Sequence, residues 1–414
     1  MKMGDTPTHP IDQEPIWIDE AYVTKILNSY TNDKLSEVKS YTKAPATVKG
    51  ENFVGALYLL SVEYVTKPGT EAQSTSFIIK TRVDNEIMSE IEEEFNMYQR
   101  EAQFYTAIMP QIYELLNTID DHTVFGPKSI YVDERIIVLE NLRPDGYVHG
   151  DVKTGLDFPH CQLILEKLAK FHAATMILYK RNPELFSNHL PGNVSEHPSP
   201  HHDLYTNLIK SAIEYCKTQP NLQQYLPKLE TLGEKIIPKM INVFSRNQAD
   251  RFHVLNHGDM WVNNILFQYD KEGELKTVRF VDYQEGYFGS PGIDWNWFIF
   301  SSWKVVVLKN NFTKLLEHYH TTLADLLHKL NYQLRIPTLD DVRKEIVNKG
   351  YHGLVTATCF LPILINEQEH LSDPSNFLLN TEEAIENRRI IFNNPKFGLR
   401  LEEFFTFFKE HDIL

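Results

Sequence analysis

The stretch 254–283, VLNHGDMWVNNILFQYDKEGELKTVRFVDY, decides the fold that we expect for this chain. Two apolar runs within it, 265–267 and 278–281, flank the polar, turn-forming segment 271–274. Apolar runs joined by a short turn that contains glycine are typical of a β-hairpin. One arm of this hairpin leads out of a loop that carries polar side chains, and the other arm leads back to it. The residues concerned are His257, Asp259 and Asn264 before the hairpin and Asp282 at its far end.

The spacing of the polar residues indicates a chemistry. Asp259 and Asn264 are five positions apart, as are the Asp and Asn of the catalytic loop of protein kinases, where the Asp accepts a hydroxyl proton and the Asn holds Mg²⁺. Asp282 would be the second metal ligand, because one carboxylate and one amide oxygen, with phosphate and water oxygens, suit Mg²⁺. The alternative is that Asp259 and Asn264 are ordinary turn residues. The order His-Gly-Asp, Asn, strand-end Asp favours the catalytic interpretation, with His257 bracing the loop.

Two segments of this region carry a resemblance. HGDMWVNNILF (257–267) and FVDYQEGYFGSPGIDW (280–295) resemble the choline kinase and aminoglycoside phosphotransferase superfamily, and most closely its ecdysteroid kinase-like branch from insects. The resemblance is specific here, looser elsewhere, and extends over most of the chain. It implies an α+β, two-lobe protein-kinase-like fold. Residues 1–141 would form an N-terminal lobe with a small antiparallel β-sheet, and residues 142–414 a larger, mainly helical C-terminal lobe.

The same resemblance implies a function. ATP and Mg²⁺ would lie between the lobes, and the γ-phosphoryl group would pass to a hydroxyl of a small molecule, with Asp259 as the base and Asn264 and Asp282 on the metal. The implied acceptor is an ecdysteroid or another steroid or xenobiotic alcohol. No Ala-Pro-Glu segment and no long activation loop separate Asp282 from Asp294, which disfavours a protein substrate.

Composition limits the class of protein. The chain has 414 residues, 42% of them hydrophobic, and a formal net charge of −15, which suits two ordinary globular domains that repel nucleic acid and anionic membranes. Cys161, Cys216 and Cys359 are odd in number and widely spaced, which is typical of a reducing compartment without disulfides. The N-terminus lacks the apolar run of a secretory signal, and no apolar segment is long enough to span a bilayer. We expect a cytoplasmic protein, whose oligomeric state the sequence leaves open.

The N-terminal part reads as a helix followed by strands. Apolar residues recur at helical spacing in 18–30, which predicts an amphipathic helix. Segments 36–43, 52–64 and 74–82 are rich in β-branched and aromatic residues and are separated by glycines, which predicts a three-stranded antiparallel meander.

Three residues of this meander are candidates for binding nucleotide. Gly50 and Asn52 lie in the turn KGENFVG between the first two strands, which could fold over a triphosphate with its backbone N–H groups toward the oxygens. Taken alone, an ordinary hairpin turn is the better-supported alternative. Lys80 ends an apolar strand run and could reach the α- and β-phosphates. Its alternative is a lysine that protects a sheet edge.

Further candidates follow the meander. A long helix is predicted over 86–109, and Glu101 on it is our choice for the carboxylate that orients Lys80, because it precedes a Phe-Tyr pair as in the family. Glu92 to Glu94 read instead as a solvated face. A hairpin at 131–139 runs into a hinge, where backbone groups of Glu140 and Leu142 would bind adenine.

Other features were weighed against the hairpin. His149-Gly150-Asp151 repeats the triplet, but Leu156 stands where the metal amide is needed and no hairpin follows, so we expect a loop before a helix over 159–180. His172 on that helix is expected to be a satisfied core histidine. His197, His201 and His202, in a loop at 198–202 and just before it, lack ligand spacing for a metal. Asp294 either caps the next helix or, as in the superfamily, hydrogen-bonds the catalytic-loop backbone.

Two rival functions remain. An acceptor such as choline, ethanolamine or an aminoglycoside would need an acidic or aromatic cage for its cation. Net acidity supports that alternative, and four tryptophans near the motif could serve it or a flat sterol, although core packing explains them too. The other rival is a catalytically inactive pseudokinase that binds a nucleotide or ligand. Lys80, Asp259, Asn264 and Asp282 are all present, which favours an active enzyme.

Overall fold

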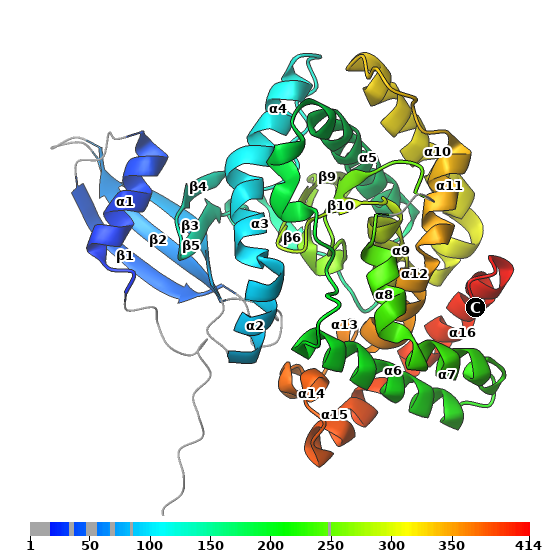
Figure 1. The fold of residues 1–414 in the computed structure, drawn as a ribbon. Coiled ribbons are helices and arrows are strands. Elements are labelled where there is room, and N and C mark those ends of the chain that lie inside the picture. The colour runs from blue at the N-terminus through cyan, green and yellow to red at the C-terminus, as the bar shows by residue number, and fades with distance from the viewer. Residues whose placement is uncertain (1–16, 33–36, 47–55, 67–70, 83–85, 247–249) are drawn as a thin grey trace, which may run out of the picture. The chain divides into compact units, whose positions relative to one another are not determined.

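The computed structural model describes residues 17–32, 37–46, 56–66, 71–82, 86–246 and 250–414 (Figure 1). They divide into two compact units. The first, here called the sheet unit, lies within 1–94 and 127–145, and the second, the helical unit, comprises 95–126 and the residues from 146 onward. The division differs from the predicted boundary after residue 141, because helices within 95–126 pack with the helical unit and only 127–145 return to the sheet.

The sheet unit is built on a five-stranded antiparallel sheet with strand order β1-β2-β3-β5-β4. The predicted meander is confirmed, and a second hairpin extends it. The helix α1 covers one face of the sheet (Figure 1), where its Val23, Ile26 and Leu27 share a buried core with apolar strand residues. The elements are α1 (Glu20–Thr31), β1 (Glu37–Pro45), β2 (Leu57–Val65), β3 (Gln73–Thr81), α2 (Glu86–Phe95), β4 (Ser129–Val132) and β5 (Ile136–Glu140).

The predicted long helix over 86–109 is not continuous. It breaks at Asn96, whose φ of 52° lies in the left-handed region, and Asn is one of the few residues that adopt that region readily. Beyond the break the chain forms α3 (Met97–Gln103), a π-helix at Phe104–Ile108 and α4 (Met109–Asn117). The break separates α2 from helices of the other unit, so one predicted helix is shared between two units.

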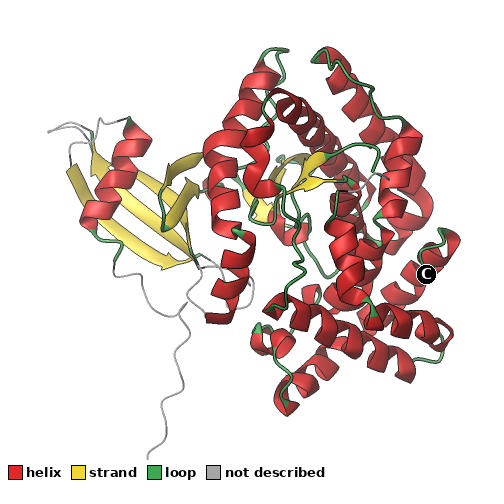
Figure 2. Ribbon diagram, viewed as in Figure 1, coloured by secondary structure: helices red, strands yellow, loops and turns green. Residues whose placement is uncertain are grey.

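The helical unit contains two small sheets, of order β6-β8-β9 and β10-β7, among many helices (Figure 2). The strands are β6 (Tyr147–His149), β7 (Val254–Asn256), β8 (Ile265–Tyr269), β9 (Leu275–Phe280) and β10 (Tyr287–Gly289). The helices are α5 (Phe158–Arg181), α6 (Pro200–Thr218), α7 (Leu226–Glu234), α8 (Ile236–Phe244), α9 (Gly292–Ser302), α10 (Val305–Lys329), α11 (Leu339–Asn348), α12 (Gly350–Val355), α13 (Leu361–Leu364), α14 (Ser375–Leu378), α15 (Glu382–Phe392) and α16 (Pro395–Glu410).

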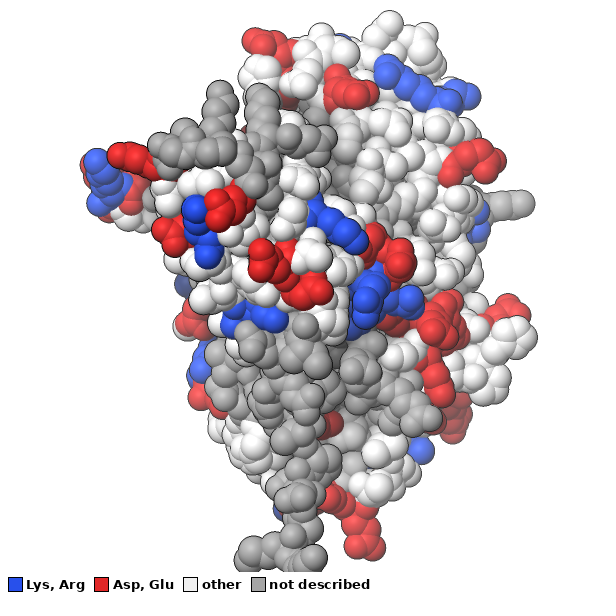
Figure 3. All heavy atoms as spheres, turned by 90° about the vertical axis from the view of Figure 1, so that its left-hand side faces the viewer, with Lys and Arg blue, Asp and Glu red and all other residues white. Residues whose placement is uncertain are grey.

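Surface charge and helix apolarity test whether the chain has features for binding nucleic acid or crossing a membrane. On the face shown in Figure 3, Lys and Arg side chains are interspersed with Asp and Glu side chains. Among the described residues on that face, these mixed signs form no extended basic footprint for nucleic acid. None of the helices that the structure describes combines the length and the apolarity needed to cross a membrane.

Candidate active site

The predicted hairpin at 265–280 is confirmed as β8 and β9. Ile265 lies opposite Phe280 in the register, and the N–H of Val281 donates to the carbonyl of Asn264 at 3.0 Å. The loop 257–264 enters the hairpin from β7, which pairs with β10. Both ends of the hairpin are therefore held beside the same loop, as the sequence predicted.

Asp294 fixes the backbone of this loop. Its side chain is fully buried, with Oδ2 accepting a hydrogen bond from the N–H of His257 at 2.8 Å and Oδ1 one from Gly258 at 2.9 Å. The residue is the third of α9, whose N-cap is Pro291. Of the two predicted roles for Asp294, binding of the catalytic-loop backbone is the one confirmed.

His172 supports Asp294 from α5. Its Nε2 lies 3.1 Å from Asp294 Oδ2 and its Nδ1 lies 2.7 Å from the Tyr319 hydroxyl. Burial lowers the pKa of His172 and so favours the neutral imidazole, although the contact with Asp294 acts in the opposite direction. The prediction of a satisfied core histidine is confirmed, and its partner connects it to the catalytic loop.

The turn at Gly258 needs glycine. Its φ is +87°, and a Cβ atom there would lie 2.1 Å from the carbonyl oxygen of Glu285. A side chain would thus meet both the left-handed backbone and a fixed backbone oxygen. On one side of it, His257 Nε2 lies 3.0 Å from the carbonyl oxygen of Val281, and the N–H of Asp259 lies 3.4 Å from His257 Nδ1. The predicted bracing role of His257 is confirmed.

Asp259 and Asn264 are brought together as their spacing suggested. Asn264 Nδ2 donates to Asp259 Oδ2 at 2.7 Å and to the carbonyl oxygen of Asp259 at 2.9 Å. The short helix Val262–Asn264 makes this possible, because it turns the chain back toward Asp259. Both bonds use Nδ2, so Oδ1 is the atom of the amide that remains for a metal ion.

Negative charge gathers around Asp259. Burial, together with the charges of Asp282 and Glu285, raises the pKa of Asp259 to about 8, against the effect of hydrogen bonds from Asn264 and Trp261. Asp282 lies two positions beyond β9 with a φ of 68°, in the region that Asp tolerates better than most residues. Carboxylates that repel one another in this way favour a bound cation, which offsets their negative charge.

Glu285 is a residue of this site that sequence reasoning missed. Asn193 Nδ2 donates to its Oε2 at 2.8 Å and to its carbonyl oxygen at 3.0 Å. Arg100, which is 1% exposed, in turn donates to Asn193 Oδ1 at 2.5 Å. The signal in the sequence was a carboxylate three positions after Asp282, but its distance from Asp259 depends on how the loop folds.

The predicted metal ligands, Asn264 and Asp282, suit Mg²⁺ in kind. An amide oxygen and a carboxylate oxygen are hard donors, and Mg²⁺ in phosphate-transfer sites takes its remaining ligands from phosphates and water. Within the described ranges, no group of three or more His, Cys, Asp or Glu side chains is placed to hold a metal ion. A pair of Asn264 and Asp282 is no such group, because one of its members is an amide.

Lys80, Glu140 and Leu142 belong to the sheet unit. Lys80 is 7% exposed on β3, opposite Leu57 and Ile137 in the register. The N–H of Glu140 donates to Lys128 at 2.9 Å, and the carbonyl of Leu142 accepts from Asp145 at 3.2 Å, so two of the four backbone groups of the predicted hinge pair are already used.

The remaining predicted nucleotide residues are distributed differently. Glu101 is 1% exposed on α3 of the helical unit, and its Oε1 accepts a hydrogen bond from the N–H of Tyr283 at 3.3 Å. It therefore lies against the residue that follows Asp282. Gly50 and Asn52 lie outside the described residues.

The assignment of Glu92 to a solvated face is wrong. Glu92 is 3% exposed, and its Oε1 lies 2.9 Å from Arg82 Nη2. Its neighbour Ile91 is also buried. A buried carboxylate is favourable when an arginine meets it, and the sequence alone placed Arg82 on a separate strand.

The second His-Gly-Asp triplet lies closer to the hairpin than predicted. His149 is the last residue of β6, which pairs with β8 so that His149 faces Leu266, whereas the sequence indicated only a loop. Asp151 itself is exposed, and its Oδ1 accepts from the N–H of Lys153 at 2.9 Å. Such a contact within a turn is what Asp makes commonly.

The histidine-rich segment also differs from its prediction. The helix α6 begins at Pro200, so His201 and His202 lie in its first turn and not in a loop. The His201 ring packs against Phe95 and Tyr205, and burial lowers the pKa of His201 to about 4. This histidine is part of an aromatic core.

Known proteins were compared with the chain. The sequence model of the ecdysteroid kinase-like family matches residues 49–332, more than half of the chain. No curated protein matches it. Among solved structures, an ethanolamine kinase from Plasmodium vivax is 15% identical, with 92% of this chain and 90% of that chain covered and a TM-score of 0.41. A spectinomycin phosphotransferase in complex with ADP and spectinomycin is 12% identical, with 96% and 100% covered and a TM-score of 0.43. Likenesses this weak carry no argument.

Proposed function

This chain belongs to the ecdysteroid kinase-like family, and from that membership we propose that it is an ATP- and Mg²⁺-dependent small-molecule kinase. The γ-phosphoryl group would pass to a hydroxyl of an ecdysteroid or of another steroid or xenobiotic alcohol. The observation that supports this most is the contact of Asn264 Nδ2 with Asp259 Oδ2, at 2.7 Å, on a loop whose backbone is bound by buried Asp294. A loop of turn residues alone would not need such a buried anchor.

Asp259 is the proposed base. Its carboxylate would accept the proton of the attacking hydroxyl, and the hydrogen bond from Asn264 would hold it in one orientation. Asp294 and His257 are positioning residues. Asp294 accepts from the backbone N–H groups of His257 and Gly258, and the His257 ring contacts the Val281 carbonyl and the N–H of Asp259. Pre-ordering of this kind matters because phosphoryl transfer depends mainly on positioning and charge stabilisation.

Asn264 Oδ1 and Asp282 would hold Mg²⁺. The bound ion would offset the negative charge of the phosphates and of the carboxylates around Asp259. Lys80 is proposed to bind the α- and β-phosphates, with Glu101 orienting it. Gly50 and Asn52 would lie over the triphosphate.

Adenine recognition is assigned to the backbone of Glu140 and Leu142. The carbonyl of Glu140 and the N–H of Leu142 are the groups of this pair not used in the contacts to Lys128 and Asp145. One donor and one acceptor of this kind match the edge of an adenine ring.

The side chains near the loop bear on the choice of acceptor. Trp261, Trp295 and Trp303 are buried, and the partly buried Trp297 stacks on His352, so core packing explains all four tryptophans. Glu285, beside Asp259, keeps choline, ethanolamine or an aminoglycoside as the alternative acceptor, because its carboxylate would attract an ammonium group.

One experiment separates these proposals. The purified protein is incubated with Mg²⁺–ATP and a panel of ecdysteroids, other sterols, xenobiotic alcohols, choline and aminoglycosides, and products are searched for a mass gain of one phosphate. A gain on a steroid alcohol supports the proposal, and a gain only on cations favours the alternative. Stabilisation by ATP in a thermal-shift assay without turnover on any acceptor would favour a pseudokinase and contradict the proposed activity.

Replacement of Asp282 tests the metal site. Asp282→Ala should weaken binding of Mg²⁺–ATP by about tenfold or more, while binding of ATP without metal changes little, because a metal ligand contributes only when the ion is present. Asp270→Ala, which removes a carboxylate at the opposite end of the same hairpin, is the matched control and should change neither affinity. Equal effects of Asp282→Ala with and without Mg²⁺, measured by calorimetry, would remove this residue from the metal site.

A further inference from the structure

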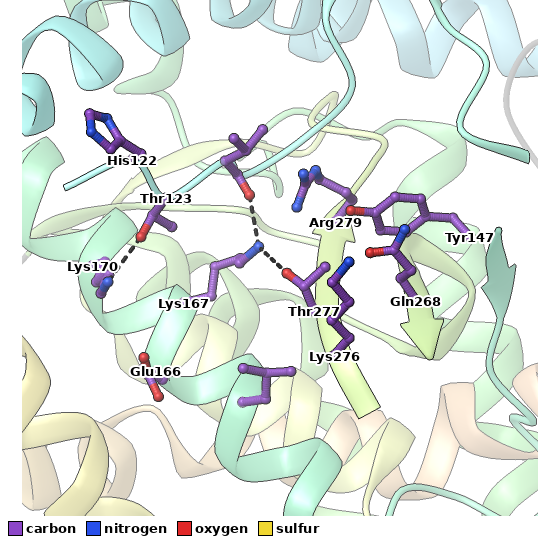
Figure 4. Close-up of a pocket in the computed structure, with 12 residues that line it drawn as sticks. His122, Thr123, Tyr147, Glu166, Lys167, Lys170, Gln268, Lys276, Thr277 and Arg279 are labelled. Carbon is purple, nitrogen blue, oxygen red and sulfur yellow. Dashed lines mark hydrogen bonds between the residues drawn. The ribbon is translucent and has the colours of Figure 1, made fainter. Parts of the chain in front are cut away.

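The helical unit contains a pocket that shares no residue with the proposed active site. Its volume is about 390 Å³, and it lies between α5, the β6-β8-β9 sheet and the loop at 122–124 (Figure 4). This volume is within the range of small-molecule sites, about 300 to 1,000 Å³. The pocket is therefore large enough for a small metabolite.

The lining of this pocket is basic although the chain is acidic. Lys167, Lys170, Lys276 and Arg279 line it, and Glu166 is the acidic residue among its lining side chains. The formal net charge of the whole chain is −15. The Oε2 atom of Glu166 lies 3.4 Å from Nε2 of His318, which is not a lining residue of the pocket. A local excess of positive charge in an acidic protein marks a place where an anion would be bound selectively.

Lys167 lines the pocket with an amino group that is hydrogen-bonded to neighbouring backbone. The residue is 6% exposed, and its amino group donates to the carbonyl oxygen of Val124 at 2.7 Å and to that of Val278. It also lies 3.5 Å from Thr277 Oγ1 (Figure 4). These acceptors are neutral, so they satisfy its hydrogen bonds without cancelling its charge. Burial, followed by the charges of Arg279 and Lys170, lowers the pKa of Lys167 to about 7.

Arg279 and Lys276 project from the same strand, β9. The Arg279 guanidinium carbon lies 5.2 Å from the centroid of the Tyr147 ring, and Nη1 donates to the carbonyl oxygen of Val278 at 3.2 Å. The Tyr147 ring and the Val278 carbonyl orient the guanidinium group. Because both are neutral, they leave its positive charge uncompensated. Lys276 is exposed on the strand. Lys170, by contrast, is already paired with Asp121 at 2.9 Å.

We propose that this pocket binds a phosphate oxyanion, either free phosphate or the phosphate monoester of a small metabolite. Arg279 and Lys276 would contact the oxyanion directly, since an arginine fork held over a ring is well suited to phosphate oxygens. Lys167, whose amino group is already used in backbone hydrogen bonds, would add attraction in its protonated form without direct contact. The volume beyond that of one phosphate group would accept the remainder of a monoester.

Titration calorimetry on the full-length protein tests the proposal. Inorganic phosphate and phenyl phosphate are titrated without Mg²⁺ or nucleotide, at constant ionic strength set by potassium chloride. Saturable binding of at least one of them is expected, and the tighter of the two identifies the source as free phosphate or monoester. Lys276→Gln and Arg279→Lys should each raise the Kd about tenfold, the size expected for one charge-assisted hydrogen bond.

Matched variants make the result specific. Lys271→Gln removes the same charge from the turn of the same hairpin, outside the pocket, and should leave the Kd within about twofold. Lys80→Ala should also leave it unchanged. The proposal is overturned if neither anion binds saturably, if Lys271→Gln weakens binding as much as Lys276→Gln, or if Lys80→Ala abolishes binding that Lys276→Gln preserves. Because Lys276 is exposed, its variant is expected to fold even if Arg279→Lys does not.

Discussion

Asp259→Asn is expected to lower kcat for phosphoryl transfer by at least about a hundredfold, the lower range for loss of a positioned general base. The amide is nearly the same size as the carboxyl group, and its oxygen can still accept from Asn264 Nδ2, which now lies 2.7 Å from Asp259 Oδ2. The loop should therefore keep its shape. ATP affinity, measured by calorimetry, should change little, because Asp259 is assigned to the acceptor hydroxyl and not to the nucleotide.

Asp151→Asn is the internal control for that result. Asp151 occupies the same position of a His-Gly-Asp triplet, but it is exposed and accepts from Lys153 N within its own turn. We expect its kcat to stay within about threefold of wild type, a change in barrier well under 1 kcal/mol. If Asp151→Asn inactivated a folded protein as thoroughly as Asp259→Asn, the loop after β6 would have to take part in the acceptor or nucleotide site.

Asp294→Asn is expected to lower both stability and turnover. The variant presents an NH₂ group where one carboxylate oxygen now accepts from a buried N–H, so at least one donor of His257 or Gly258 loses its partner. Breaking a fully buried charged contact costs about 3 kcal/mol or more in the free energy of unfolding. Because the loop that carries Asp259 loses its anchor, kcat should fall by about tenfold or more as well.

Asp157→Asn is the matched control for Asp294. Asp157 also stands at the start of a helix and beside a histidine, since it is the N-cap of α5 with His160 Nδ1 at 2.5 Å. Its side chain is 47% exposed, and Asn is as good an N-cap as Asp. Urea denaturation should show a change of a few tenths of a kcal/mol at about unchanged kcat. An Asp294→Asn protein as stable and active as this control would reduce Asp294 to a helix-start residue.

Local features were read correctly where the information lies in neighbouring residues. The hairpin, the helix over 159–180 and the meander all follow from hydrophobic period and turn residues, and each is present with ends shifted by a few positions. Asp294 was placed near the loop from the family resemblance, and two hydrogen bonds confirm it. His172 was recognised as a core residue because it lies on an apolar helix face.

The features that the sequence did not predict depend on contacts between distant segments. The sequence pattern around Asn96 is that of a continuous helix and gives no sign of the left-handed turn. The turn forms where the chain passes from one unit to the other. Glu92 reads as one of a run of acidic residues until Arg82 meets it. The strand β6 is three residues long, too short to carry a period of its own, and it exists because β8 pairs with it.

By itself, the sequence determined the residues of the candidate site. Asp259 and Asn264 have a spacing that a single helical turn brings into contact, and Asp282 follows the end of the returning strand. These are local relations, fixed by residue types and chain geometry. The tertiary structure decided which charges meet. Glu285 raises the pKa of Asp259 because Asn193 binds its side chain and because Gly258, which has no side chain, leaves room for the Glu285 backbone. The basic pocket likewise draws Lys167 and Arg279 from segments 112 residues apart, a proximity that only the packing of α5 against the hairpin creates.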